Sequence, residues 1–343
     1  MRQPSDKVRW GILGTGKIAA LFATGLAALP EAELLAVGSR AGQTAREFGA
    51  RFNISHRHCH GSYEDLANDP LVDVIYVATP HMLHKDCTLL CLAAGKPVLC
   101  EKPLAINAAE AQEMIAAACR QNLFLMEAMW TRFTPVMQKV RALLAEKAIG
   151  EVRMLSADFG FRAELNPSHR LFSREYGGGA LLDVGTYLVS FSSMVLGRPS
   201  RIVSMAHLGE TGVDEQAAMI FGHHGGQLAV LSAAIRTDTP TVATIMGTSG
   251  QITIHSDWYK PTTMTLKTEG NEPQRFHYER SGNGFNYEAA EVMRCLWKGE
   301  LESPVMPLEE SLSIMRTLDE IRAQWGLQYP VESGMSSLQT AGG

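Results

Sequence analysis

The chain has no excess of basic charge. Its 343 residues include 31 Lys and Arg against 36 Asp and Glu, for a net charge of −5 at pH 7, and no basic stripe marks it as a nucleic-acid binder. It also has no uninterrupted apolar run of membrane-spanning length, and its first nine residues are mostly polar, unlike a signal peptide. We therefore expect a cytoplasmic protein whose partners include neither nucleic acid nor a membrane.

Cysteine is scarce. The chain has six cysteines, most of them in apolar stretches, as with Cys87 and Cys91, where a thiol behaves as a small hydrophobic group. A chain of this length can build its core without disulfides. The segment His56-Arg57-His58-Cys59-His60 has metal-ligand residue types, but no second ligand group follows at zinc-like spacing. The sequence therefore predicts no metal site.

The chain does have an ordinary globular composition, 45% hydrophobic and 20% charged, and a length that suggests about two domains. Strand-like and helix-like segments alternate over its N-terminal part, which is typical of a doubly wound parallel sheet, the Rossmann arrangement. Ligands of such sheets bind beyond the carboxyl ends of the strands. The predicted strands are Val8–Leu13, Glu33–Ser39, Val72–Ala78, Pro97–Glu101 and Phe124–Glu127, and the predicted helices are Ile18–Leu29, Thr44–Phe52, Leu83–Ala94 and Ala108–Gln121.

After Met129 consecutive strands replace the alternation, which predicts an α+β domain with a large, mostly antiparallel, open-faced sheet. We expect a dinucleotide-binding domain over residues 1–127, a substrate-binding and oligomerisation domain over 128–331, and a flexible tail over 332–343. The predicted strands are Val152–Phe161, Ile202–Leu208, Ala217–Phe221, Gln227–Arg236, Thr241–Gly247, Gln251–His255 and Thr263–Lys267, and the predicted helices are Pro135–Glu146, Ala180–Leu196, Phe285–Trp297 and Leu308–Trp325.

A glycine motif joins the first predicted strand to the first predicted helix. It reads Gly11-Ile-Leu-Gly14-Thr-Gly16-Lys-Ile-Ala19, the G-x-G-x-x-G/A pattern of a dinucleotide site in its required strand–turn–helix context. Gly14 permits the tight turn, Gly16 lets a pyrophosphate approach the backbone, and Ala19 allows close packing of helix on strand. The helix N-terminus then offers free N–H groups to the phosphates.

The end of the second predicted strand indicates which nicotinamide cofactor binds. An acidic residue there would hydrogen-bond the ribose 2′-hydroxyl of NAD, whereas an Arg accommodates the 2′-phosphate of NADP. This chain has Ser39-Arg40 and no acidic residue until Glu47. The sequence therefore favours NADP over NAD, the alternative being that Arg40 is only a solvated surface residue.

Two further motifs could carry chemistry. Glu101-Lys102-Pro103 ends a predicted strand at the ligand edge, where a lysine can bind a substrate oxygen or lower the pKa of a neighbour, unless it is a surface lysine. In Gly177-Gly-Gly-Ala-Leu-Leu-Asp183-Val-Gly-Thr-Tyr187 the acid and the phenol stand one helical turn apart on an otherwise apolar face. Polar groups there are costly unless paired or used, although a capping Asp and an interfacial Tyr would fit the same pattern.

Taken together, these motifs with Ala78-Thr79-Pro80-x-x-x-His84 resemble the glucose–fructose oxidoreductase / inositol dehydrogenase (Gfo/Idh/MocA) family over nearly the whole chain. Glu127-Ala-Met-Trp130-Thr-Arg132-Phe133 resembles the branch of dimeric dihydrodiol dehydrogenase and NADP-dependent D-xylose dehydrogenase. Tyr187 stands where most of the family has His. That departure matches this branch and makes an inositol dehydrogenase less probable.

The resemblance implies roles for single residues. Lys102 assists catalysis, Tyr187 transfers the proton, Asp183 orients the substrate, and Trp130 and Phe161 line an apolar substrate wall. A free Tyr is a poor base at neutral pH, but an ammonium group nearby lowers its pKa, so Lys102 and Tyr187 make chemical sense as a pair. The cofactor-binding residues expected from motif and resemblance are Gly11, Gly14, Thr15, Gly16, Lys17, Ile18, Ser39, Arg40, Thr79, Pro80, His84, Glu101 and Lys102.

We expect an oxidoreductase that transfers a hydride between NADP and a secondary alcohol or hemiacetal carbon of a small polyol, either an aldose such as D-xylose or a trans-dihydrodiol. The alternative is an NADP-binding sensor or regulatory protein without turnover. The presence of Lys102, Asp183 and Tyr187 together favours the enzyme, since a sensor need not keep a proton-transfer pair. Resemblance to the branch also implies a homodimer or higher homo-oligomer that packs sheet against sheet.

Overall fold

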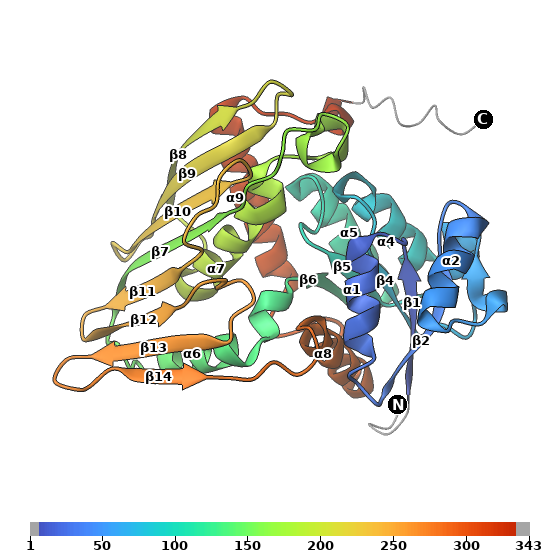
Figure 1. Ribbon diagram of the computed structural model, residues 1–343, viewed down its shortest axis with the longest axis horizontal. Coiled ribbons are helices and arrows are strands. Elements are labelled where there is room, and N and C mark those ends of the chain that lie inside the picture. Colours follow the sequence, from blue (N-terminus) through green and yellow to red (C-terminus); the bar gives the residue numbers. More distant parts are fainter. Residues whose placement is uncertain (1–6, 334–343) are drawn as a thin grey trace. The chain divides into compact units, whose positions relative to one another are not determined.

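The computed structural model describes residues 7–333, and the chain forms two compact units (Figure 1). The first unit takes in the chain up to Phe133 together with Arg280–Leu312, and the second takes in Thr134–Glu279 together with the residues from Ser313 onward. Most of the predicted flexible tail, 334–343, lies outside the described residues, whereas Pro330–Ser333 forms a short 3-10 turn. The functional division into the domains 1–127 and 128–331 stays a prediction.

The first unit contains the predicted parallel sheet. Its six strands lie in the order β3-β2-β1-β4-β5-β6, every neighbouring pair is parallel, and β1 lies between β2 and β4, where the direction of winding changes. Such a switch point is where open α/β sheets bind their ligands. The strands are β1 (Val8–Leu13), β2 (Ala32–Gly38), β3 (Cys59–His60), β4 (Val74–Val77), β5 (Val98–Glu101) and β6 (Leu125–Ala128), and the helices before Phe133 are α1 (Lys17–Leu26), α2 (Gly42–Phe52), α3 (Tyr63–Ala67), α4 (His84–Ala93) and α5 (Ala108–Gln121).

The predicted elements of this unit match the observed ones to within a few residues, and the sequence left out only the shortest of them. Strand β3 has two residues and helix α3 has five, too few for a periodic pattern. Strands β4, β5 and β6 are buried along their whole length, as expected for a sheet covered on both faces. The ring of Phe22 on α1 stacks on Tyr76 of β4 and meets Trp10 of β1 edge-on, which fixes this helix against the sheet.

A late segment returns to the first unit, which the sequence did not indicate. Helix α8 (Phe285–Lys298) packs against α1, and the Asn283 side chain donates a hydrogen bond to the carbonyl of Leu21 at 2.7 Å. The rings of Phe285 and Trp130 stack with centroids 5.0 Å apart. These contacts join residues that are more than 150 positions apart in the sequence, so no local pattern could predict them.

The second unit contains an eight-stranded sheet in the order β14-β13-β12-β11-β7-β10-β9-β8. All neighbours are antiparallel except β7 and β10, which run parallel, so the mostly antiparallel sheet of the prediction is confirmed. The strands are β7 (Val152–Gly160), β8 (Arg201–Leu208), β9 (Asp214–Gly222), β10 (Leu228–Ala234), β11 (Ala243–Gly247), β12 (Gly250–Ile254), β13 (Thr263–Thr268) and β14 (Gln274–His277), with helices α6 (Pro135–Ala145) and α7 (Thr186–Leu196), while α9 (Leu308–Trp325) runs from the first unit into the second.

One face of this sheet is apolar and exposed. Helix α7 contacts β7 and β10 on the buried face (Figure 1), and burial alternates along β9 and β10. On the opposite face large apolar side chains face outward, with Met205 77%, Val203 50% and Ile220 49% exposed. Strand register places Val203 and Val230 beside Ile220. We call the following set the open sheet face: Met154, Val203, Met205, Ile220, Leu228 and Val230.

The helix predicted over 180–196 differs in its first turn. Residues Leu181–Gly185 form a π-helical turn, and regular α-helix begins only at Thr186. A single π turn inside a helix is frequent at functional sites. The surrounding segment Arg174–Leu196 is long and apolar enough to cross a membrane by length and composition alone. It contains Arg174, Glu175 and Asp183, and 72% of its most apolar window is buried inside the protein, as in the core helix of a globular domain.

Candidate active site

The glycine loop has the shape that a dinucleotide requires. Gly14 has φ +109°, and a Cβ at this position would lie 2.8 Å from the carbonyl oxygen of Ala78, so only glycine fits. A Cβ on Gly16 would meet no atom within 4 Å. Gly16 is the N-cap of α1 and gives it no side-chain hydrogen bond, so the helix N-terminus is open toward this space. The loop therefore fits a pyrophosphate bound to backbone N–H groups.

Ser39 and Arg40 directly follow β2, where the predicted NADP would place its 2′-phosphate. Ser39 is buried, and its hydroxyl lies 2.6 Å from the Thr44 hydroxyl at the start of α2. Arg40 is exposed. An exposed guanidinium next to a fixed hydroxyl can bind a phosphate dianion without losing an internal ion pair.

His84 contacts two backbone carbonyl groups of the protein with its two ring nitrogens. Its side chain is fully buried, with Nδ1 2.8 Å from the carbonyl oxygen of Pro103 and Nε2 2.9 Å from that of Thr79. The two loops that follow β4 and β5 are thereby tied together through one imidazole. Thr79, Pro80 and Lys102 consequently lie at the same edge of the sheet as the glycine loop.

Glu101 and Lys102 form the end of β5. Glu101 is buried and accepts hydrogen bonds from the Tyr76 hydroxyl and from the backbone N–H of Lys102, the latter at 3.1 Å. The Lys102–Pro103 peptide bond is cis. On α8 in the same unit, Glu288 is fully buried, and neither of its carboxyl oxygens has a hydrogen-bond partner among the described residues. Burial, with Glu101 nearby, raises the pKa of Glu288 well above its ordinary value, which favours a neutral carboxyl.

The second unit carries the other candidate catalytic residues. Asp183 lies in the π turn and Tyr187 in the first turn of α7, and both are buried. The Arg170 guanidinium donates to Asp183 Oδ1 at 3.1 Å. The ring of Tyr187 lies 5.6 Å from that of Phe159 and 6.0 Å from that of Tyr259. A carboxylate and a phenol on one helix thus adjoin an aromatic surface, an arrangement that can hold a ring carrying hydroxyl groups.

A buried acid supports the helix that carries this pair. Asp214, at the start of β9, accepts a hydrogen bond from the backbone N–H of Leu181 at 2.6 Å. A Cβ on Gly179, which has φ +116°, would lie 2.1 Å from Asp214 Oδ1, so the glycine turn can close over the carboxyl only without a side chain. The Tyr329 hydroxyl donates to the carbonyl of Gly178 at 2.8 Å. Asp214 and Tyr329 together fix the start of the π turn.

The remaining predicted site residues are distributed over both units. Trp130 belongs to the first unit and is buried against Phe285, while Phe161 follows β7 in the second unit and is half-buried. A cavity of about 460 Å³ in the second unit is lined by residues that do not include Asp183 or Tyr187, namely Arg162, Ala163, Glu164, Leu165, Arg236 and Thr237. The structure therefore joins the cofactor residues with Lys102 in one unit and Asp183 with Tyr187 in the other.

Sequence reasoning missed three residues of the second unit. Arg170 begins a three-residue 3-10 turn, too short for a periodic pattern, and contacts Asp183 13 positions later in the sequence. Tyr259 is next to Trp258 in a connection between strands, and its stacking on Phe159 at 4.1 Å joins residues 100 positions apart. Asp214 is the first residue of β9. An acidic residue at the start of a strand is typical of the preceding turn, so nothing in the sequence indicated a buried carboxyl there. No local signal distinguishes any of the three.

Comparison with known families adds independent support for the fold of both units. A family described as "Oxidoreductase family, NAD-binding Rossmann fold" matches residues 8–129. A second family, described as "GFO/IDH/MocA C-terminal domain", matches residues 137–253. The two matches together cover more than half of the chain.

Curated relatives match over nearly their whole length. The trans-1,2-dihydrobenzene-1,2-diol dehydrogenase of Xenopus tropicalis is 43% identical over 331 residues, which is 94% of this chain and 99% of that protein. The protein of the same name from Homo sapiens is 40% identical over 333 residues, 94% of this chain and 98% of its own.

Solved structures share the fold. A 3-ketoreductase from Actinomadura kijaniata in complex with NADP and TDP-benzene superposes with a TM-score of 0.81 at 25% identity, covering 93% of this chain and 98% of that chain. An aldose-aldose oxidoreductase from Caulobacter crescentus complexed with glycerol superposes with a TM-score of 0.85 at 24% identity, covering 94% and 98%. At this identity the second likeness concerns the fold.

Proposed function

Since the chain belongs to the Gfo/Idh/MocA family of NAD(P)-dependent oxidoreductases and is a dehydrogenase acting on CH–OH groups, we propose that its substrate is a small cyclic diol or sugar, with a trans-dihydrodiol of an arene preferred over an aldose. The observation that carries the preference is the aromatic surface of Phe159, Tyr187 and Tyr259 beside Asp183. A flat, partly unsaturated ring suits this surface, while its two hydroxyl groups suit the carboxylate and the phenol.

The proposed chemistry assigns one task to each residue. NADP, when bound, supplies the hydride acceptor. The hydroxyl proton of the substrate passes to the Tyr187 oxygen, while Asp183, held by Arg170, accepts a hydrogen bond from the second hydroxyl. Lys102 supplies a positive charge that favours the anionic form of the phenol. The low exposure of Asp183 and Tyr187 excludes bulk water, which strengthens these interactions.

For the cofactor we propose NADP rather than NAD, with binding residues as predicted from the sequence. The observations that support the preference are the exposed Arg40, the buried Ser39 fixed by Thr44, and the lack of an acidic side chain at 39 and 40. A carboxylate at this position would repel a 2′-phosphate, whereas a guanidinium attracts it.

For assembly we propose a homodimer in which the open sheet face of one copy packs on that of a second copy. Contiguous exposed apolar patches of several hundred Å² usually mark an interface, and strand register places Val203 and Val230 on either side of Ile220 on this face. A flat sheet face is self-complementary under twofold symmetry.

We also propose a cytoplasmic location, because all six cysteines are free, as in a reducing compartment.

The function is tested by turnover and by one substitution. Incubation with NADP and a panel of trans-dihydrodiols, aldoses and polyols should produce reduced nicotinamide fastest with a dihydrodiol. Tyr187→Phe keeps the ring but removes the transferable proton, so kcat on the best substrate should fall about 10²- to 10⁴-fold, with NADP affinity nearly unchanged.

The matched control is Tyr278→Phe, a half-buried tyrosine of the same unit outside the site, which should leave kcat unchanged. A loss of less than about fivefold in Tyr187→Phe, far below the range of general acid–base catalysis, would contradict the assigned role. An aldose as the best substrate of the panel would contradict the preference for a dihydrodiol.

A further inference from the structure

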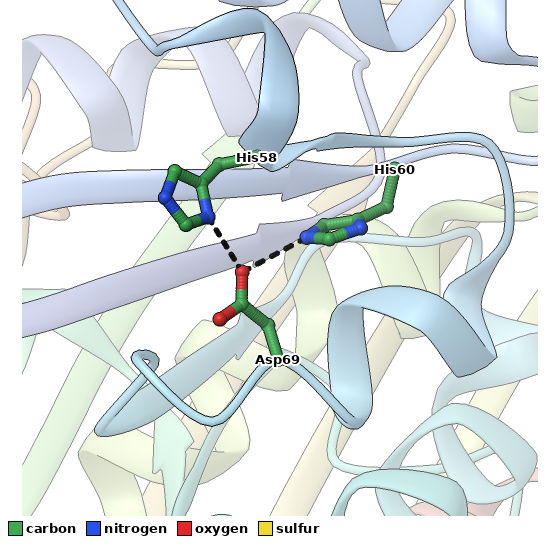
Figure 2. Close-up of side chains that lie close together, drawn as sticks. All are labelled: His58, His60 and Asp69. Carbon is green, nitrogen blue, oxygen red and sulfur yellow. Dashed lines mark hydrogen bonds and ion pairs between the residues drawn. The ribbon is translucent and has the colours of Figure 1, made fainter.

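At the free edge of the parallel sheet, three side chains that could bind a metal converge, distant from the proposed catalytic residues in the sequence. His58 ends a 3-10 turn, His60 lies on the edge strand β3, and Asp69 follows helix α3. Figure 2 shows both imidazole rings pointing toward one carboxylate oxygen of Asp69. His58 Nδ1 lies 2.7 Å from Asp69 Oδ2, and His60 Nε2 lies 3.0 Å from it.

We propose that His58, His60 and Asp69 form a binding site for a divalent transition-metal ion, zinc first of all. The three potential ligand atoms all lie within 4.8 Å of one another. Tetrahedral zinc with bonds of about 2.0–2.1 Å separates its ligand atoms by about 3.3 Å. The two observed nitrogen–oxygen distances, 2.7 and 3.0 Å, are shorter than this, so an ion requires both rings to move away from Asp69 Oδ2.

The backbone explains why these residues meet. His58 ends the 3-10 turn, and His60 lies two positions later on β3; both rings face Asp69 (Figure 2). The Cys59 side chain between them is directed elsewhere, with Sγ 3.6 Å from the carbonyl oxygen of Ser55. Helix α3 then turns the chain back and brings Asp69 to the two imidazoles. The sequence-based expectation of no metal site looked for a ligand pair at zinc-like spacing and did not consider a single acid returned by a short helix.

Asp69 is held in place as a metal carboxylate usually is. Its second oxygen, Oδ1, accepts the backbone N–H of Leu71 at 2.9 Å, which leaves Oδ2 for the ligand side. The Lys96 ammonium donates to the carbonyl oxygens of Asp69 and Val72 at 2.7 and 2.9 Å, which fixes the loop. Such outer contacts orient metal ligands.

Burial and access both suit an ion. The side chains of His58 and Asp69 are 8% and 5% exposed, and that of His60 is 16% exposed, so the site is mostly dry with its opening beside His60. The other ring nitrogen of His58, Nε2, is buried without a hydrogen-bond partner among the described residues. Among the described residues, the hydrogen-bonded nitrogen of this ring is therefore Nδ1, which faces Asp69.

The ligand set selects the class of ion. Two imidazoles and one carboxylate are borderline donors that suit Zn²⁺, Fe²⁺, Co²⁺ or Cu²⁺. Ca²⁺ and Mg²⁺ need six or more oxygen ligands or several retained waters, and this set offers a single carboxylate. With three protein ligands, a fourth position remains for water.

Each imidazole has one nitrogen facing Asp69 Oδ2. That nitrogen would bind the ion while the ring's other nitrogen carries the proton, so two neutral imidazoles and one carboxylate would hold the dication with a net charge of +1. Such an ion would clamp β3 to the loop after α3, beside β2, where the backbone N–H of Ser39 donates to the carbonyl of His60 at 3.2 Å.

The test is calorimetric titration of the untagged, full-length protein, first stripped with EDTA, with ZnCl₂. We expect one strong equivalent. His60→Ala, at the rim, should weaken it by more than the about 10- to 100-fold typical of losing an outer contact, and Asp69→Asn should do the same. His56→Ala removes an exposed histidine two positions from His58, and Cys59→Ser removes the intervening thiol, and both should bind zinc as the unmodified protein does.

Cobalt supplies an independent signature. Co²⁺ should give visible d–d absorption of a nitrogen–oxygen site in the unmodified protein and in His56→Ala, but not in His60→Ala, with circular dichroism reporting that each variant is folded. If Asp69→Asn does not fold, His60→Ala decides. No strong equivalent in the unmodified protein, an unchanged affinity in His60→Ala, or an equal loss in His56→Ala would each overturn the site and indicate adventitious binding only.

Discussion

Replacing Asp214 by Asn should change how the stability of the second unit depends on pH. Asp214 is fully buried beneath the turn that precedes Asp183 and Tyr187. Burial raises the pKa of its carboxyl from 3.8 to about 7, even though hydrogen bonds from Leu181 and Ala180 and the charge of Arg322 oppose the rise. Asn keeps the shape and an acceptor oxygen for Leu181 N–H, but it does not titrate.

The direction in which stability changes with pH follows from which state binds the Asp214 proton. Between about pH 4 and pH 7 the folded protein keeps the Asp214 proton while the unfolded chain has lost it, so stability falls as pH rises through this window. A rise of about three pKa units corresponds to about 4 kcal/mol. The stability that Asp214 contributes is therefore complete below pH 4 and lost above pH 7, whereas the Asn variant lacks this dependence.

The measurement is the free energy of unfolding in urea at pH 4.5 and pH 7.5 for both proteins, with hydrogen exchange of the segment 180–190 as a local probe. Other titrating groups cancel in the difference between the two proteins. The free energy of unfolding of Asp214→Asn minus that of the unmodified protein should increase by about 3 kcal/mol from pH 4.5 to pH 7.5. Parallel pH curves for the two proteins would refute the assignment of a raised pKa to Asp214.

Three further changes test the proposals. Arg40→Ala should raise KM for NADP and affect NAD little, and equal KM values for both cofactors in the unmodified enzyme would contradict the NADP preference. Lys102→Met should lower kcat and shift the remaining activity to higher pH, because the phenol loses a neighbouring positive charge; an unchanged pH profile would argue against this role. Met205→Lys should convert the dimer to monomer in light scattering at micromolar concentration, whereas Leu301→Lys, at an exposed leucine outside the open sheet face, should not; a monomeric unmodified protein would exclude the dimer.

The sequence by itself determined the first sheet and its ligand edge. Buried parallel strands are short apolar runs, their crossover helices are amphipathic, and both signals lie within windows of about ten residues. Gly14 could be assigned from sequence because its turn requires a backbone that other residues avoid. The helix with Asp183 and Tyr187 was also predicted, since four positions of spacing on an apolar segment place both on one side.

Only the tertiary structure decided which distant groups meet. Asp214 lies 33 residues after Leu181, Arg170 contacts Asp183, and Arg280–Leu312 returns to the first unit. Asp69 reaches His58 and His60 because a five-residue helix turns the chain. Local periodicity reports which side of an element is buried, but not what lies against it. Those partners depend on chain reversals and packing between elements, and single buried polar contacts of this kind leave no repeating pattern in the sequence.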